Sequence, residues 1–183
     1  MADTKIKMTE LELKGALLLE AFQASDNRGR FTKYFENEMF EKLKFEVRES
    51  FASSNLKGVI RGLHFQNPQP QARIVWCPYG KIWDVIVDLR KNSKTYKKWH
   101  AEELSDQNKR GLYMPRGFAH GFISLSEGAY VLYLADAPWN PQAEKGIIYN
   151  DAALGIRWPK PVKGPIVSKR DAAFTAFRDE DAY

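Results

Sequence analysis

Short apolar runs separated by turn-forming residues fill most of the chain. Between residues 58 and 135 the runs are rich in Val, Ile, Phe, Tyr and Trp, and Gly, Pro and Asn interrupt them at intervals of about ten residues. No sustained helical periodicity lies among them. The pattern therefore predicts an antiparallel β-sandwich or barrel and disfavours a parallel α/β sheet.

Each apolar run predicts a strand. Residues 11–20 predict a hairpin or a bulged strand pair, because Lys14 and Gly15 interrupt an otherwise apolar run. In the strand 82–89, alternation gives one wholly apolar face and a second face that carries Asp84 and Asp88. The other predicted strands cover residues 31–35, 47–54, 58–66, 73–77, 96–104, 112–114, 118–125 and 129–135.

The remaining segments predict loops and two short helices. Residues 1–10 are polar and are expected to be loose, and the turn formers at 25–29 predict a loop. Residues 36–44 predict a short helix whose apolar side chains share one face. Beyond Pro138 the chain is rich in Pro, Asn, Asp and Gly and predicts mainly loops, while Ser168 to Asp171 has the form of a capping box that opens a closing helix.

The predicted strand 58–66 carries a histidine and an arginine around a glycine. Alternation puts Gly62, His64 and Gln66 on one face and Arg61 on the other. Gly62 permits a bulge or a close backbone approach. His64 fits a base in a pocket, with Arg61 as a cation for an anionic substrate. It equally fits a buried, hydrogen-bonded histidine beside a surface arginine.

Composition narrows the class of protein. The length of 183 residues fits one domain that covers residues 1–183. The aromatic content of 13% suits either a small-molecule pocket or a large β core. The net charge of +5 is compatible with an anionic ligand, but the Lys and Arg residues are scattered, so no nucleic-acid partner is expected.

Cysteine content and apolar run length predict the environment of the protein. Cys77 is the single cysteine, which excludes an intrachain disulfide and a cysteine zinc site and predicts an inert core thiol. No run approaches the roughly 18 apolar residues of a membrane span, and no signal-peptide pattern opens the chain. We therefore expect a cytoplasmic protein without a membrane partner.

The three histidines do not have the spacing of a metal site. A metal in a small β barrel usually needs paired ligands such as His-x-His with a further His or carboxylate. Gln66 stands where a second histidine would complete that pair with His64, and His100 and His120 lie on other predicted strands. His100 is expected to be structural or solvated. The sequence therefore disfavours a metal.

Proton-transfer chemistry without a metal needs a base, a group that orients it, an acid on the opposite face and a donor to the developing oxyanion. His64 is the candidate base. The residue types and their spacing leave several candidates for each of the other roles. These are Asp171, Asp84 or Asp88 for orientation, Tyr130 or Tyr133 for the acid, and Arg73 or Lys81 for the oxyanion.

An ordered set of motifs resembles one enzyme family, the nucleoside-diphosphate 4-keto-6-deoxysugar epimerases, whose main members are the dTDP-4-dehydrorhamnose 3,5-epimerases. The similarity runs from about residue 22 to residue 171, and the whole set in order is far more specific than any one motif. The matching segments are Asp26–Phe31, Gly58–Gln66, Gln71–Val75, Asp84–Arg90, Pro115–Phe122, Leu132–Tyr133, Asn150–Asp151, Ile156–Pro159 and Ser168–Asp171.

The resemblance implies a cupin-type jelly roll, or double-stranded β-helix, with short peripheral helices. It also implies a homodimer that uses neither a metal nor an organic cofactor. By position, the general base is His64, its orienting partner Asp171, the general acid Tyr133, the second active-site histidine His120 with Asp84, and the pyrophosphate-binding arginines Arg28 and Arg61.

Several positions depart from the usual family pattern. Arg73 replaces a lysine, Trp139 replaces a tyrosine near the sugar, and Lys33 replaces a glutamate. Glu49 and Phe51 lie where the family usually has Gln-Asp-Asn. The remaining candidates for substrate contact are Phe31, Gln66 and Arg170.

The expected activity is inversion of C3, C5 or both in a nucleoside-diphosphate 4-keto-6-deoxyhexose, dTDP-linked by family majority. His64 and Tyr133 would transfer the protons through an enolate. The alternatives are an epimerase acting at a single carbon of a GDP- or CDP-linked sugar and a cupin that binds a nucleotide sugar without catalysis. A metal-dependent cupin oxygenase is disfavoured, because Gln66 breaks the His-x-His pair.

Overall fold

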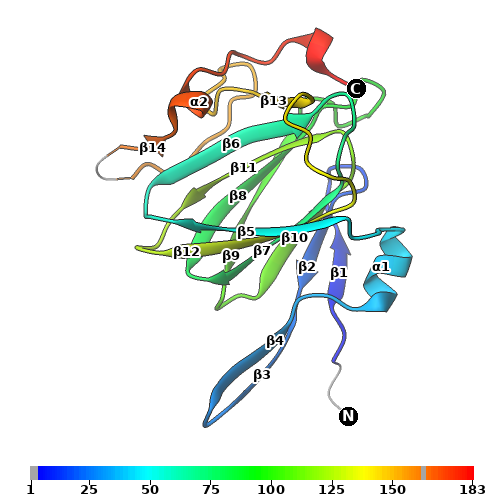
Figure 1. The fold of residues 1–183 in the computed structure, drawn as a ribbon, viewed down its shortest axis with the longest axis vertical. Coiled ribbons are helices and arrows are strands. Elements are labelled where there is room, and N and C mark those ends of the chain that lie inside the picture. The colour runs from blue at the N-terminus through cyan, green and yellow to red at the C-terminus, as the bar shows by residue number, and fades with distance from the viewer. Residues whose placement is uncertain (1–3, 162–163) are drawn as a thin grey trace.

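Two mainly antiparallel sheets face each other in the computed structural model, which describes residues 4–161 and 164–183 (Figure 1). The first sheet has the strand order β1 (Lys7–Glu10), β2 (Leu17–Glu20), β10 (Arg110–Met114), β7 (Arg73–Tyr79), β12 (Ala129–Ala135) and β5 (Glu49–Asn55). The second has the order β13 (Glu144–Gly146), β6 (Val59–Gln66), β11 (Phe118–Ser124), β8 (Lys81–Asp88) and β9 (Trp99–Ser105), with β14 (Ile166–Val167) parallel to β6.

The other elements lie outside this sandwich. Strands β3 (Phe22–Asp26) and β4 (Gly29–Lys33) form a separate hairpin that projects away from both sheets (Figure 1). The helices are α1 (Asn37–Leu43), α2 (Lys169–Ala172) and a short 3-10 helix at Asp179–Asp181. The expectation of a cupin-type β fold with short peripheral helices is confirmed.

Alternation along the strands creates three apolar layers. The inner faces of both sheets pack together, as Val75 and Val131 of the first sheet meet Ile82 and Ile86 of the second. Helix α1 covers the outer face of the first sheet, and the C-terminal segment covers the outer face of the second. The apolar face predicted for residues 82–89 lies under that segment, with Val85, Val87 and Leu89 fully buried.

Most predicted strands are present, and the differences are local. The polar segment 1–10 contains β1, which pairs with β2 and forms an ion pair between Lys7 and Glu20; residues 1–3 of that segment lie outside the described residues. Residues 11–16 therefore connect two strands and are not half of a hairpin within 11–20. The loop predicted at 25–29 is a tight turn between β3 and β4, since Asp26 pairs with Gly29.

Two further boundaries differ from the prediction. The strand expected at 31–35 ends at Lys33, and the strand expected at 96–104 begins at Trp99 because residues 93–98 form turns closed by backbone hydrogen bonds. The helices are where the patterns predict them. Ser168 caps α2 by accepting a hydrogen bond from the Asp171 N–H. Cys77 is buried, and burial raises the pKa of its thiol to about 12.

Candidate active site

A cavity of about 430 Å³ lies between the two sheets, beside the apolar inner layer. Strands β5, β7 and β12 line it from the first sheet, and β6, β11 and β13 from the second. The lining residues are Glu49, Phe51, Ser53, Arg61, His64, Gln71, Arg73, His120, Phe122, Tyr133, Trp139, Glu144 and Arg170.

An irregularity in β6 brings two candidate site residues, Arg61 and His64, to this cavity. The pairing register between β11 and β6 shifts between His120, which pairs with His64, and Phe122, which pairs with Arg61. Strict alternation predicted that Arg61 and His64 lie on opposite faces, and this prediction is wrong, because the register shift turns both toward the cavity.

Gly62 makes the irregularity possible. Its φ of +109° lies where residues with a Cβ are strained, and a Cβ there would lie 2.6 Å from both Gly121 Cα and the His120 carbonyl oxygen. The close backbone approach of β6 and β11 that the glycine permits was one of the two interpretations open from the sequence, and the structure has it together with a register shift.

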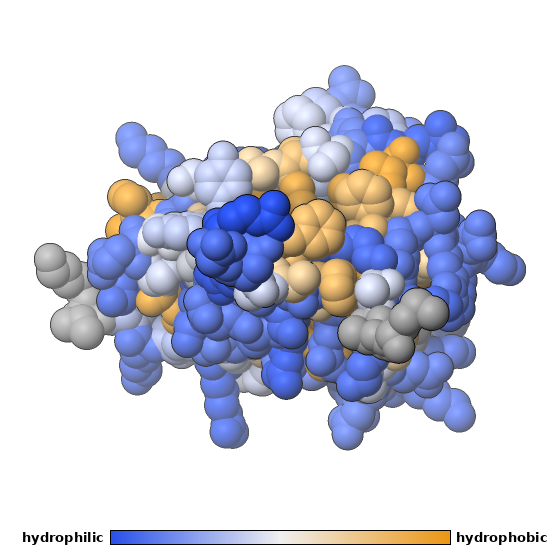
Figure 2. Space-filling model, turned by 90° about the horizontal axis from the view of Figure 1, so that it is seen from below, coloured by the Kyte–Doolittle hydropathy of each residue, from blue (hydrophilic) through white to orange (hydrophobic). Residues whose placement is uncertain are grey.

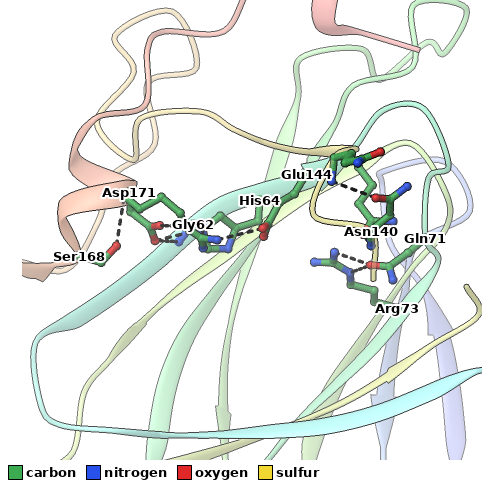
Figure 3. A network of polar contacts seen from close by, with 11 residues as sticks. Gly62, His64, Gln71, Arg73, Asn140, Glu144, Ser168 and Asp171 are labelled. Carbon is green, nitrogen blue, oxygen red and sulfur yellow. Dashed lines mark hydrogen bonds and ion pairs between the residues drawn. The ribbon is translucent and has the colours of Figure 1, made fainter. Parts of the chain in front are cut away.

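His64 and Asp171 form the central polar pair of the site. Asp171 Oδ2 lies 3.1 Å from His64 Nε2 and accepts a hydrogen bond of 3.0 Å from the Gly62 N–H (Figure 3). Burial acts to raise the pKa of Asp171, but the hydrogen bonds from His64 and Gly62 outweigh it and hold this pKa well below its usual range. Asp171 is therefore the ionised partner of the imidazole.

Arg170 contacts both His64 and Asp171 from the solvent side. Its Nη2 lies 3.1 Å from His64 Nε2, its Nε lies 3.2 Å from Asp171 Oδ1, and its Nη1 lies 2.9 Å from Glu144 Oε2. The side chain of Arg170 is about half exposed, whereas that of Asp171 is buried. One exposed guanidinium thus links the pair to the acidic residue on β13.

His120 and Asp84 form a second pair on the neighbouring strands β11 and β8. Nε2 of His120 lies 2.8 Å from Asp84 Oδ2, and both side chains are buried. Burial raises the pKa of Asp84 despite the opposing effect of His120. The ring centroid of His120 lies 5.8 Å from that of Tyr133, across the two sheets.

Tyr133 reaches the cavity from β12. It is buried and stacks on Phe51 of the neighbouring strand β5, with 4.7 Å between ring centroids. Burial, followed by the negative charge of Asp84, raises the pKa of its phenol above the usual value. A phenol in this position keeps its proton at neutral pH and can act as a donor.

Two arginines complete the polar lining. Arg73 donates from Nε and Nη2 to Gln71 Oε1, at 3.0 and 2.6 Å (Figure 3), and burial lowers the pKa of its guanidinium. Gln71 is fixed in turn by its hydrogen bond to the Ala137 carbonyl. Arg61 donates from Nε to Asn55 Oδ1 at 2.7 Å. Both cations are therefore held by neutral amide oxygens rather than by carboxylates.

The loop after β12 forms the rim of the cavity. Trp139 is 53% exposed, and its backbone N–H donates a hydrogen bond to Glu49 Oε2. Gln66 is buried and does not line the cavity. Its amide accepts from the Asn140 N–H and donates to the Gln69 and Pro138 carbonyls, so it holds this loop.

Three residues predicted to contact substrate lie on the projecting hairpin or at its base, away from the cavity lining. Arg28 pairs with Asp26 at the tip, and Lys33 pairs with Glu36. Phe31 is 64% exposed. Figure 2 views the molecule from the end where this hairpin projects, and hydrophobic side chains there lie among hydrophilic ones.

The other candidates of the sequence analysis have different partners. Asp88 binds Arg90, Ser93 and Thr95, so it orients no histidine. Lys81 pairs with Glu103, and Tyr130 is about half exposed outside the cavity lining. The structure thus separates the alternatives that the spacing left open.

Several cavity residues have no distinctive sequence signal. Glu144 lies in a loop-rich region, on a strand of three residues that no periodicity marks. Ser53 reaches the cavity only because of strand alternation. Phe122 ends the family-like segment Pro115–Phe122 but was not named as a candidate site residue. Gln71 belongs to one of the family-like motifs, and its contact with Arg73 could have been suspected from that position.

Among residues 4–161 and 164–183, no three His, Cys, Asp or Glu side chains gather as a metal-ligand set. The same part of the chain contains no helix with the length and hydropathy needed to cross a membrane.

Comparison with known proteins assigns the family. Residues 10–179 match the family model described as dTDP-4-dehydrorhamnose 3,5-epimerase. A relative of that name from Methanothermobacter thermautotrophicus is 39% identical over 186 residues, and the match covers 100% of both chains. The Legionella pneumophila dTDP-6-deoxy-D-glucose-3,5-epimerase, solved with dTDP-4-keto-L-rhamnose, is 33% identical with a TM-score of 0.90, and the match covers 94% of this chain and 93% of that one.

A monoepimerase is also similar. The 3′-monoepimerase ChmJ from Streptomyces bikiniensis, solved with dTDP-quinovose, is 30% identical with a TM-score of 0.86 and is covered over 92% of this chain and 87% of its own. The family match and the identity over the full length agree with the order of motifs and with the fold. The chain therefore belongs to the dTDP-4-dehydrorhamnose 3,5-epimerase family of isomerases.

Proposed function

We propose that residues 1–183 act as one cofactor-independent epimerase domain that inverts C3, C5 or both in a dTDP-linked 4-keto-6-deoxyhexose. The observation that carries the proposal is that His64, which is paired with Asp171, and Tyr133 line the same cavity from opposite sheets. A base and an acid on opposite walls suit inversion, because one removes a proton and the other delivers one to the opposite face. The dTDP-sugar ligands of the Legionella and Streptomyces structures support the substrate class.

His64 is the base in this mechanism. The C4 ketone acidifies the hydrogens on C3 and C5, and His64 takes one of them. In this step the Nε2 hydrogen is directed at Asp171, which requires the Arg170 guanidinium, a donor only, to turn away from Nε2, and the neutral ring keeps its lone pair on Nδ1. The ionised carboxylate then stabilises the imidazolium that forms.

Arg73 and His120 are suited to the charge that develops on the C4 oxygen. Proton removal moves negative charge from carbon onto this oxygen, where a fixed cation in a cavity shielded from water is most effective. The guanidinium of Arg73 stays charged and is held by Gln71. His120, fixed by Asp84, is the second donor available at the same cavity.

Tyr133 completes the inversion by giving its phenolic proton to the carbon. Its raised pKa keeps the proton in place until a carbanion-like centre is present. The stacking on Phe51 holds the ring against the wall of the cavity. Removal of a proton by His64 on one face and delivery on the other therefore inverts the centre.

We propose that the protein acts as a homodimer. Arg28, Phe31 and Lys33 lie outside the cavity of their own chain, on or next to a hairpin that projects from the sandwich (Figure 1). Such a hairpin can bring a cation and an aromatic ring to the cavity of a second copy, where they would contact the nucleotide. Arg61 and Arg170 supply cations for the diphosphate from within the chain.

Inversion at a single carbon is the second candidate. Trp139 occupies the rim position where the family usually carries a tyrosine, and its bulk limits how the sugar can turn. The similarity to a 3′-monoepimerase agrees with this alternative. Double and single inversion share the same base and differ in how many carbons reach it.

Proton NMR in deuterated buffer tests both candidates. The protein is incubated with dTDP-, GDP- and CDP-linked 4-keto-6-deoxyglucose, and deuterium uptake is followed at C3 and C5. We expect uptake with the dTDP sugar, at one or two positions, and loss of uptake in His64→Ala. Calorimetric binding without any uptake would instead indicate a cupin that binds nucleotide sugars without catalysis.

A further inference from the structure

Two buried polar atoms lie behind the active-site histidine without a partner. Among the described residues, Asp84 Oδ1 and His100 Nε2 are both buried and accept or donate no hydrogen bond. The other carboxylate oxygen of Asp84 is used by His120. Unpaired buried polar atoms are costly, so each calls for a partner or for a function.

The pairing of β8 with β9 brings these atoms to one face of the sheet. Asp84 lies opposite Glu102, and Ile86 lies opposite His100. Asp84 and His100 are therefore diagonal neighbours, with Cα atoms about 7–8 Å apart, on the inner face that Ile86 shares with the core. The charge of each residue acts on the other, in agreement with this proximity. A water molecule can bridge two polar groups that lie too far apart for a direct hydrogen bond.

The same face continues to solvent. Nε2 of His100 lies 3.8 Å from Glu102 Oε2, and Glu102 Oε1 lies 2.6 Å from Arg110 Nη1. The side chain of His100 is 28% exposed and that of Arg110 is 43% exposed. A chain of polar groups thus leads from the cavity, through His120 and Asp84, to the edge formed by β9 and β10.

The proposed reaction creates a need for such a chain. In each inversion His64 takes a proton from a carbon of the sugar, which breaks one carbon–hydrogen bond. The O–H bond of Tyr133 then breaks as the new carbon–hydrogen bond forms on the opposite face. The inversion leaves an imidazolium at His64 and a phenolate at Tyr133. The imidazolium can lose its proton to solvent through the cavity, where the side chain of His64 is 17% exposed. Tyr133 lines the same cavity but is 7% exposed, so it has less access to solvent on that side.

We propose that one water molecule joins Asp84 Oδ1 to His100 Nε2, and that His120, Asp84, this water and His100 return a proton from solvent to Tyr133 after each inversion. His100 takes the proton from bulk water, each member passes one on, and His120 delivers one to the phenolate. The proton that His64 releases balances the one that enters, so none is consumed overall. The inference rests on the proposed function.

The directions of the pKa shifts of Tyr133 and His100 favour transfer of a proton toward Tyr133. Burial raises the pKa of Tyr133, so its phenolate recovers a proton readily. Burial lowers the pKa of His100, while the facing carboxylates Glu102, Asp84 and Glu12 oppose this effect. With its pKa lowered, His100 passes a proton on and does not keep it.

His100→Gln tests the relay, because glutamine can still bind a water molecule but does not titrate. Rapid-quench measurements compare the first turnover with the steady state. We expect the first turnover at the wild-type rate, since Tyr133 starts protonated, followed by a steady-state rate at least about tenfold lower. The ratio kcat/KM stays unchanged while kcat falls. His100→Phe is expected to behave in the same way.

Glu103→Gln is the matched control, since Glu103 is the exposed neighbour of Glu102 on β9 and its carboxylate forms an ion pair with Lys81. It should show no burst. A His100→Gln enzyme with wild-type steady-state turnover would overturn the relay, and so would an equal loss in the first and later turnovers. Absence of turnover in the wild-type protein would reject the proposed function and the relay with it. Turnover in the wild-type protein without a burst in His100→Gln would reject the relay alone.

Discussion

The carboxylate of Asp171 lies 3.1 Å from the imidazole of His64 and at the same time accepts a hydrogen bond from the Gly62 N–H. One side chain therefore fixes both the ring and the backbone irregularity two residues before it. The electrostatics of the proposed base and the local shape of β6 depend on the same group.

Asp171→Asn should remove the negative charge while keeping the size of the side chain. An amide cannot stabilise the imidazolium as a carboxylate does, so we expect deuterium uptake from buffer to slow by about 100-fold or more. Ser168→Ala is the control, because it removes only the cap of α2 and should cost about 1 kcal/mol of stability. A similar rate loss in both variants would mean that the position of α2, and not the charge, decides activity.

The stability contribution of Asp171 should depend on pH. Its pKa in the folded protein lies below the usual value of 3.8, so the unfolded chain binds this proton first as the pH falls. The contribution is therefore complete above about pH 5 and is lost progressively as the pH falls toward the lowered pKa of the folded state. Urea unfolding at pH 7 and pH 3 measures the free energy of unfolding of both proteins. The wild type should be more stable than Asp171→Asn by a larger margin at pH 7 than at pH 3. An equal difference at both values would contradict the assigned ionisation.

Tyr133→Phe should separate proton exchange from inversion. His64 remains able to remove a proton and return a deuteron to the same face, so we expect deuterium uptake with retained configuration. Tyr130→Phe, on the same strand but outside the cavity lining, should behave as wild type. NMR of the product sugar distinguishes the outcomes, and inversion by Tyr133→Phe would assign the acid to another group.

Gly62→Ala should destabilise the protein by at least about 2 kcal/mol, because a positive φ is strained and the new Cβ meets the backbone of β11. Gly155→Ala is a matched control. Its φ of +61° is also positive, but the nearest atom to its Cβ would lie 3.9 Å away, so a cost of about 1 kcal/mol is expected. Chemical denaturation measures both, and equal costs would show that the contact with β11 relaxes freely.

Mixing two impaired variants should test the homodimer. If the hairpin serves the partner's cavity, a mixed dimer of His64→Ala and Arg28→Ala contains one complete site. Subunit exchange in an equal mixture should then recover about a quarter of wild-type activity, while each variant alone stays impaired. Activity of the mixture equal to the mean of the two variants would place the hairpin's function within its own chain.

The overall fold was accessible from the sequence because alternation and turn residues act locally. Alternation correctly divided β8 into an apolar outer face and a face carrying Asp84. It failed at β6, because the register shift around Gly62 depends on the close approach of β11, which is a contact between distant segments. Local patterns cannot reveal such a contact.

The candidate site was accessible only in part. The histidine, the tyrosine and the carboxylates were all recognised as capable of chemistry, but spacing alone could not choose Asp171 over Asp88 or Tyr133 over Tyr130. The order of motifs made that choice. In the structure Asp171 lies 3.1 Å from His64, and Tyr133 lines the cavity whereas Tyr130 does not. Glu144 was missed because a strand of three residues in a loop-rich region carries no periodic signal.

The last elements of the chain carry a further consequence for how the protein matures. Asp171 belongs to a segment that packs outside the second sheet, and the backbone of Tyr183 is tied to Leu89 and Lys91. Until this segment docks, His64 lacks its carboxylate partner. Under the proposed function, catalytic competence therefore requires the C-terminal segment to be in place. Turnover in a fresh preparation would accordingly report on the intactness of the whole chain.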